Sequence, residues 1–273
     1  VGAIYPTTNL PIENVAGNTF STELAWKYGS VIGKELVSVG SNWELGTQFD
    51  LVRDIRWARA KDTYGEDYYL TGEMAVSETL GLQSQGAGAQ GKHIGAYATN
   101  GDGQLWTFVD EQTLHTAYLY PFEQPIKRAN LSQVMTTYTR LNGYYTFSNE
   151  YLLKDVLRDM WNWKGGVVTD AMSTKEFTTI LGVDSEMGKS YNTEDYVLKY
   201  MDEGLCTMDD IDTAVSHILW SMGYAGYLGL VKIDEESGLA YADSRRSIKD
   251  DGSIQYVMAG TDVSEGGERT VIE

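Results

Sequence analysis

The sequence is poor in cysteine and contains no long apolar run. Its single cysteine, Cys206, excludes an internal disulfide and any cysteine-rich metal site. No stretch is apolar for long enough to cross a bilayer, so no membrane partner is predicted. A His-Glu-x-x-His pattern is also missing, and the sequence therefore predicts neither a metal site nor a bound cofactor.

Basic residues are scarce relative to acidic ones. The 273 residues include 39 Asp and Glu against 21 Lys and Arg, which gives a formal net charge of −18. A field of this sign repels nucleic acid and anionic membrane surfaces, so neither is an expected partner. A neutral substrate is expected instead.

An initiator methionine is absent as well. The chain opens Val1-Gly2-Ala3-Ile4, without a charged-then-apolar leader. We therefore expect a fragment of a longer protein, whose natural beginning and any export signal lie upstream.

Short β-rich runs alternate with helical periodicity along most of the chain. This alternation is typical of parallel strands joined by crossover helices, and it predicts an α/β fold of the (β/α) TIM-type barrel class. Six strands are predicted, where a closed barrel has eight, at residues 3–5, 48–52, 89–94, 133–138, 166–169 and 181–183. Either some strands are weak in sequence, or the first strand lies upstream of Val1.

Three helices are the clearest. The first is capped by Ser21 or Thr22, the second begins at about Asn149, and the third follows a capping box of Thr207 and Asp210. Their predicted buried stripes are Leu24, Tyr28, Val31, Ile32 and Leu36; Leu152, Val156, Leu157 and Met160; and Ile211, Val215, Ile218, Leu219 and Met222. We predict a barrel over residues 1–230. Residues 231–273 are polar and contain glycine, so they are interpreted as a linker or the start of a second domain.

Reactive groups of a parallel barrel sit at the carboxyl ends of strands. Asp170 follows one strand, Lys92 and His93 lie in another, and Tyr138 ends a third. A carboxylate beside Lys and His has its charged form favoured, as a nucleophile requires. Two alternatives remain open at this point: Asp170 caps the following helix, and Lys92 with His93 forms a buried structural pair.

Residues 54–74 resemble the signature of glycoside hydrolase family 3, an Asp-Pro-Arg-Trp-Gly-Arg run followed by a Thr-Tyr-Gly-Glu-Asp-Pro-Tyr-Leu run. Further motifs are similar to those of the family and come in its order. They are Lys92-His93, the strand and turn at 134–143, the helix and strand at 152–170, and the helix at 212–219. The resemblance covers about residues 5–230, and it implies the barrel domain of a retaining exo-β-glycosidase, most simply a β-glucosidase.

The resemblance also implies roles for individual residues. Asp170 is implied as the nucleophile that forms a covalent glycosyl-enzyme. Arg59, Lys92 and His93 are implied to bind hydroxyls of the terminal sugar, and Met135 and Tyr138 to shape the wall of the subsite. For Arg56 and Glu66 we favour a structural role, as a buried ion pair that braces the loop.

The sequence departs from the family at several positions. Ile55 and Ala58 replace a Pro and a Gly, and Tyr68 replaces the Pro of the Glu-Asp-Pro run. Ala171 stands where many members have a Trp after the nucleophile, which leaves specificity for a second sugar open.

The general acid/base is not assigned. Two-domain members of the family supply a Glu from a second domain, and we expect such a domain as the missing partner. Single-domain members use a His in a Gly-His-Gly-Asp-Thr loop, whereas residues 98–104 contain no His. Alternatives are a β-xylosidase, a β-N-acetylhexosaminidase, or a catalytically silent sugar-binding fragment. Acidic composition and action on oligosaccharides favour a secreted or periplasmic location, but the sequence does not assign the compartment.

Overall fold

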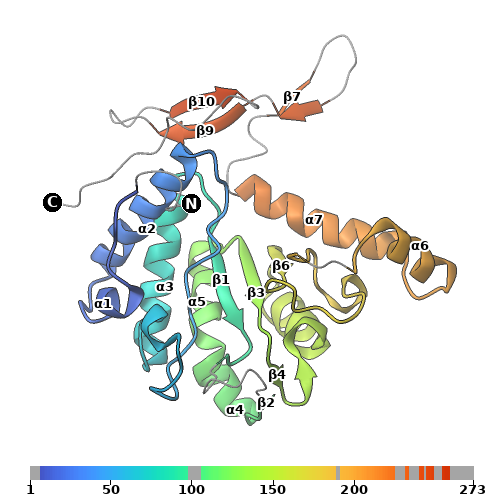
Figure 1. Ribbon diagram of the computed structural model, residues 1–273, viewed down its shortest axis with the longest axis horizontal. Helices are drawn as coiled ribbons and strands as arrows, with labels where there is room; N and C mark the ends of the chain where they lie inside the picture. Colours follow the sequence, from blue (N-terminus) through green and yellow to red (C-terminus); the bar gives the residue numbers. More distant parts are fainter. Residues whose placement is uncertain are drawn as a thin grey trace.

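A computed structural model describes residues 7–97, 106–188 and 191–224, together with the backbone of four short strands between 231 and 258 (Figure 1). The four strands are β7 (Val231–Ile233), β8 (Ala240–Ala242), β9 (Ser244–Ile248) and β10 (Ile254–Met258). They form two antiparallel pairs, β7 with β8 and β9 with β10. The predicted division at residue 230 stays a prediction.

A parallel sheet forms the centre of the molecule. Strands β1 (Gln90–Ile94), β3 (Gln133–Thr136) and β6 (Gly166–Val168) pair in that order. Isolated parallel bridges extend the sheet at both edges, by residues 43 and 48 beside β1 and by residue 185 beside β6. Five neighbouring parallel segments thus follow one another in chain order, as in the wall of a (β/α) barrel.

Three strand predictions are confirmed by β1, β3 and β6. The strand expected at 48–52 is reduced to a single bridge from Gln48 to Lys92. The strand expected at 181–183 is wrong, because the chain there forms the short 3-10 helix η5 (Thr179–Leu181). Gly182 then turns the chain with φ of 105°, and pairing with β6 occurs only at Ser185. The strand expected at 3–5 lies outside the described residues.

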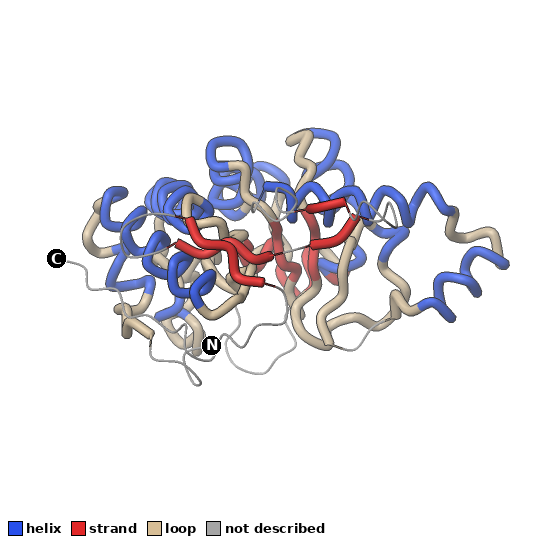
Figure 2. The backbone as a smooth tube through the Cα atoms, turned by 90° about the horizontal axis from the view of Figure 1, so that it is seen from above, coloured by secondary structure: helices blue, strands red, loops and turns tan. Residues whose placement is uncertain are grey.

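Helices lie in two groups, one on each side of the central strands in the view of Figure 1. Figure 2 shows helices toward both ends of the long axis of the molecule. One group lies beside β1 and consists of α1 (Glu13–Gly17), α2 (Thr22–Ser38), α3 (Tyr68–Gln83) and α5 (Tyr120–Ala129). The other group consists of the π-helix η4 (Tyr151–Met160), α6 (Glu194–Asp202) and α7 (Met208–Tyr224). Short turns of helix are η1 (Ala60–Asp62), α4 (Glu111–Thr113), η2 (Leu114–Tyr118) and η3 (Thr146–Ser148). None of the helices in the described residues is long and apolar enough to cross a membrane.

The first predicted helix is confirmed as α2, with Ser21 as its cap. The Ser21 hydroxyl accepts a hydrogen bond from the Leu24 amide at 3.2 Å. The predicted stripe is wrong at Leu24, which is exposed. Part of the contact surface is glycine instead, because a side chain on Gly29 or Gly33 would collide with the backbone of α3. Apolar periodicity does not detect such a face.

The two later helices are also confirmed, with corrections to their buried faces. Met160 of η4 is exposed. In α7 the capping box forms, with the Thr207 amide 2.8 Å from Asp210 Oδ2. Val215 and Leu219, however, are each 45% exposed, while Ser221 is buried and accepts a hydrogen bond from the Gly166 amide at 2.8 Å. This helix therefore meets the sheet partly through polar contacts.

Candidate active site

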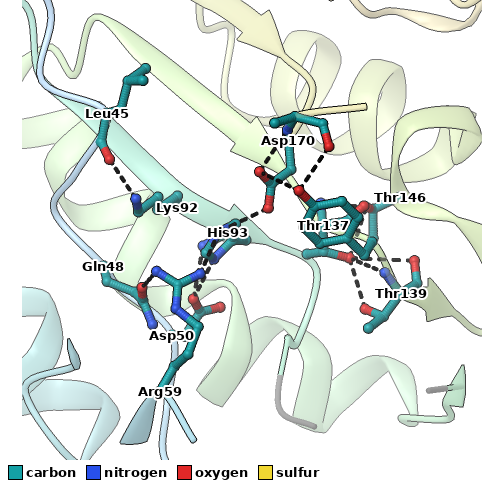
Figure 3. A network of polar contacts seen from close by, with 12 residues as sticks. Leu45, Gln48, Asp50, Arg59, Lys92, His93, Thr137, Thr139, Thr146 and Asp170 are labelled. Atoms are coloured by element: carbon teal, nitrogen blue, oxygen red, sulfur yellow. Dashed lines mark hydrogen bonds and ion pairs between the residues drawn. The ribbon is translucent and has the colours of Figure 1, made fainter. Parts of the chain in front are cut away.

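The ends of the three central strands bring the predicted site residues together (Figure 3). Asp170 comes two residues after β6, His93 lies in β1, and Tyr138 comes two residues after β3. Because adjacent parallel strands end at the same edge, these side chains converge from three segments that are far apart in sequence. Residues 171–178 form turns and irregular structure, so Asp170 does not cap a helix.

The Asp170 carboxylate is held by three groups. Its Oδ1 accepts hydrogen bonds from the Ala171 amide at 2.7 Å and from the Tyr138 hydroxyl at 3.1 Å. Its Oδ2 lies 3.3 Å from His93 Nε2. Burial alone would raise the pKa of Asp170, but hydrogen bonding and charge from His93, with the bonds from Ala171 and Tyr138, lower this pKa below its ordinary value. The carboxylate is therefore ionised at neutral pH.

His93 is oriented by a buried carboxylate that the sequence reasoning missed. Asp50 Oδ2 lies 2.8 Å from His93 Nδ1 and accepts a second bond from the His93 amide at 3.0 Å. Both side chains are only 1% exposed. Burial disfavours the imidazolium, but the charge of Asp50 and hydrogen bonds with Asp170 and Asp50 outweigh it and raise the pKa of His93. The available signal was an Asp placed between Phe49 and Leu51 in an apolar segment.

Arg59 reaches the same imidazole from the loop before α3. Its Nη1 lies 3.2 Å from His93 Nε2, its Nη2 donates to Gln48 Oε1 at 2.5 Å, and its Nε donates to Asp62 at 3.3 Å. Gln48, a second residue missed from sequence, thus fixes one end of the guanidinium. The fork geometry of Arg allows these simultaneous contacts.

Lys92 precedes His93 across a cis peptide bond, and its ammonium points elsewhere. It donates a hydrogen bond to the Leu45 carbonyl (Figure 3). Burial and the charge of Arg59 lower the pKa of Lys92, against the opposing effect of Glu44, Asp170 and Asp50. The ammonium remains close enough to Asp170 to act on it electrostatically.

Tyr138 and Met135 occupy different environments. The Tyr138 hydroxyl lies 3.1 Å from Asp170 and 2.8 Å from the Ala171 carbonyl. Burial and the negative charge of Asp170 raise the pKa of Tyr138 to about 12, so it remains a donor at neutral pH. Met135 is buried in β3, in register with Lys92 and Val168, and these three side chains leave the same face of the sheet.

The expected buried ion pair of Arg56 with Glu66 is wrong. Arg56 pairs with Asp54 at 2.6 Å, and both Arg56 and Glu66 are exposed. In the described part of the chain, no group of three His, Cys, Asp or Glu side chains is placed to hold a metal ion.

The chain is similar in sequence and structure to known β-glucosidases. The sequence is 31% identical over 257 residues to a β-glucosidase of Rhizobium radiobacter, covering 92% of this chain and 31% of that protein. The structure is similar to β-glucosidase 3B of Thermotoga neapolitana in complex with α-D-glucose, with a TM-score of 0.74 and 33% identity over 80% of this chain and 32% of that one. It is also similar to a Bifidobacterium adolescentis GH3 β-glucosidase, with a TM-score of 0.76 and 26% identity over 80% and 33% of the two chains.

This chain thus spans about a third of the length of the proteins it matches. The predicted fold class, a (β/α) barrel of TIM type, is confirmed by these structural likenesses. Residues 1–220 match the family described as the glycosyl hydrolase family 3 N-terminal domain. The chain therefore belongs to glycosyl hydrolase family 3.

Proposed function

We propose that this chain is the catalytic barrel of a retaining exo-β-glycosidase of β-glucosidase type. The substrate is a neutral oligosaccharide or an aryl or alkyl glycoside, from which the terminal non-reducing sugar is removed. One observation carries the proposal: Asp170 is an ionised carboxylate at a strand end, held by His93 and Tyr138. The activity named for the Rhizobium and Thermotoga proteins supports it.

In the first step an Asp170 oxygen attacks the anomeric carbon. The bond from this carbon to the leaving oxygen breaks as the new bond forms, and the leaving oxygen takes a proton from a carboxylic acid. The product is a glycosyl ester of Asp170 and a free alcohol. A lowered pKa suits Asp170 to this role, because only the ionised carboxylate attacks.

In the second step the deprotonated acid takes a proton from water. The water oxygen attacks the anomeric carbon, the ester bond breaks, and Asp170 leaves as a carboxylate. The sugar is released with its configuration retained. We assign the acid/base to a second domain beyond the barrel of residues 1–230, positioned about 5–5.5 Å from Asp170 when substrate is bound.

The surrounding residues bind the terminal sugar. Arg59, Lys92 and His93 offer charged donors for sugar hydroxyls, and charge-assisted hydrogen bonds of this kind are strong. Met135 and Tyr138 form part of the wall. Before substrate arrives, Lys92 donates to the Leu45 carbonyl, so binding through its ammonium requires exchange of that bond.

Covalent trapping tests the nucleophile. The complete translation product that contains this chain is treated with 2,4-dinitrophenyl 2-deoxy-2-fluoro-β-glucoside, and the labelled peptide is located by mass spectrometry. We expect the label on Asp170 and a loss of turnover of more than about 10³-fold in Asp170→Asn. A label on another residue overturns the assignment. Asp155→Asn, which changes an exposed carboxylate on η4, serves as the matched control and should keep full activity.

A panel of aryl glycosides separates the alternatives. Preferential turnover of the glucoside supports the β-glucosidase type. Preferential turnover of the xyloside indicates a β-xylosidase, and preferential turnover of the N-acetylglucosaminide indicates a β-N-acetylhexosaminidase. Saturable sugar binding without turnover, even of a glycosyl fluoride, identifies a silent sugar-binding module instead.

A further inference from the structure

A small sheet next to the candidate active site carries exposed aromatic side chains that the proposed reaction does not use. It consists of β2 (Trp106–Thr107), β4 (Arg140–Leu141) and β5 (Tyr144–Tyr145). Trp106 is 55% exposed and Phe108 is 70% exposed, with ring centroids 6.3 Å apart. Burial in the core therefore does not account for either ring.

The indole of Trp106 is held rigidly from one side. The Arg140 guanidinium lies 4.7 Å from the Trp106 ring and 4.3 Å from the Tyr145 ring, so it stacks with both. Tyr145 in turn stacks on buried Phe147, with centroids 4.9 Å apart and planes within 12°. This column fixes Trp106 to the core while much of the indole stays open to solvent.

Arg140 is committed to this column. Within residues 7–97, 106–188 and 191–224, it forms no ion pair with a carboxylate, unlike Arg56, Arg59, Arg128 and Arg158. Its guanidinium N–H groups remain suited to donate to a neutral hydroxyl. An aromatic face beside such a donor provides an apolar surface and a hydrogen bond at the same place.

The small sheet adjoins the ends of the catalytic strands. The Thr107 hydroxyl donates to the Ala96 carbonyl at 3.3 Å, three residues after His93. Strand β4 begins two residues after Tyr138, which contacts Asp170. Strand spacing places the Trp106 and Tyr138 backbones within about 12 Å of each other. Figure 1 shows β2 and β4 together below β1 and β3.

We propose that Trp106, Phe108 and Arg140 form a binding surface for sugar units on the leaving-group side of an oligosaccharide substrate. This inference rests on the proposed function, because the exo-acting pocket holds one terminal sugar and directs the remaining units outward. The ring of a second or third unit lies on the open face of Trp106, and Arg140 donates to one of its hydroxyls. Position 171, where many members of the family have a Trp, is Ala in this chain. The surface at Trp106 would supply the aromatic contact that Ala171 cannot make.

The test compares substrates of different length in the complete protein. Trp106→Ala should raise KM two- to tenfold for cellotetraose or laminaritetraose, the range expected for loss of one aromatic contact. It should leave kcat/KM for 4-nitrophenyl β-glucoside within twofold. Trp106→Phe should recover most of the loss, and Phe108→Ala should give a smaller effect in the same direction.

Tyr144→Ala is the matched control. Tyr144 is 65% exposed on the same hairpin, but it precedes Tyr145 and so leaves the opposite face of β5. Tyr144→Ala should change neither KM for the tetrasaccharide nor kcat/KM for 4-nitrophenyl β-glucoside. If Trp106→Ala lowers activity on both substrates equally, or on neither, the proposal is wrong.

Failure of the proposed function and failure of the sugar-binding surface give different results. A wild-type protein that turns over no aryl glycoside refutes the enzyme assignment. Binding of the tetrasaccharide to the Asp170→Asn variant, measured by tryptophan fluorescence, still tests the surface. Adding Trp106→Ala to that variant should weaken binding two- to tenfold. Unchanged binding overturns the surface by itself.

Discussion

Asp50 holds His93 through a single oxygen, which accepts from both the ring Nδ1 at 2.8 Å and the backbone amide at 3.0 Å. Asp50 thereby stabilises a proton on Nδ1 and favours the imidazolium form of His93, which carries a second proton on Nε2. The other nitrogen, Nε2, faces Asp170 at 3.3 Å and Arg59 at 3.2 Å. A buried carboxylate therefore controls, through one imidazole, how strongly Asp170 is held as an anion.

Asp50→Asn should shift the acidic limb of the pH profile of kcat/KM to higher pH. The raised pKa of His93 depends on the charge of Asp50, so the substitution lowers that pKa. Less imidazolium then faces Asp170, and the pKa of Asp170 rises from its lowered value. An unshifted limb would contradict this coupling. Asp155→Asn, exposed on η4, should leave the profile unchanged.

Arg59→Lys should lower kcat/KM for an aryl glycoside by about 10- to 100-fold, as expected for lost charged hydrogen bonds. An ammonium cannot reproduce the contacts that the guanidinium makes with Gln48, His93 and Asp62. Steady-state kinetics measures the effect. Arg56→Lys, at an exposed pair with Asp54, should remain within twofold of wild type. Equal losses in both variants would count against a specific role for Arg59.

Asp184→Ala should lower the free energy of unfolding by about 3 kcal/mol. Asp184 accepts from Arg158 at 2.9 Å, from the Val167 amide at 2.7 Å and from His217 at 2.9 Å, and it joins η4, β6 and α7. Its removal leaves the Arg158 charge without a carboxylate. Urea denaturation measures the loss. The surface pair Lys154–Glu150 joins η4 to the residue that precedes it, and Glu150→Gln should cost less than about 0.5 kcal/mol.

Glu44→Gln should reduce the loss of stability between pH 4.5 and pH 8. Burial raises the pKa of Glu44 from 4.5 to about 7, although a hydrogen bond from Thr47 opposes the change. The folded protein therefore binds this proton more tightly than the unfolded chain. Stability falls as pH rises from about 4.5 to about 7 and then levels off.

The amide side chain in the Glu44→Gln variant cannot titrate. The difference in unfolding free energy between pH 4.5 and pH 8 should therefore shrink by about 1–2 kcal/mol. The figure is reduced from the full shift because Glu44 is only half-buried. Urea denaturation at both pH values measures it. Glu23→Gln, an exposed position on α2, should retain the wild-type difference, and an equal response of the two variants would refute the prediction.

The sequence located most of the central elements but not their contacts. Short β-rich runs marked β1, β3 and β6, and helical periodicity marked α2, η4 and α7, because both signals are local. Leu24 and Val215 were assigned to buried faces although they are exposed. Periodicity shows which face of a helix is apolar, whereas its partner helix or sheet determines how much of that face is covered.

The sequence by itself determined the order of parallel strands and helices, and it placed Asp170 and Tyr138 at strand ends and His93 within a strand. These properties follow from local pattern and from motif order. Only the tertiary structure decided that Asp50 orients His93, that Gln48 anchors Arg59, and that Lys92 donates to Leu45. Asp50 and His93 are 43 residues apart, and chain folding alone determines which buried polar groups at such separations satisfy one another.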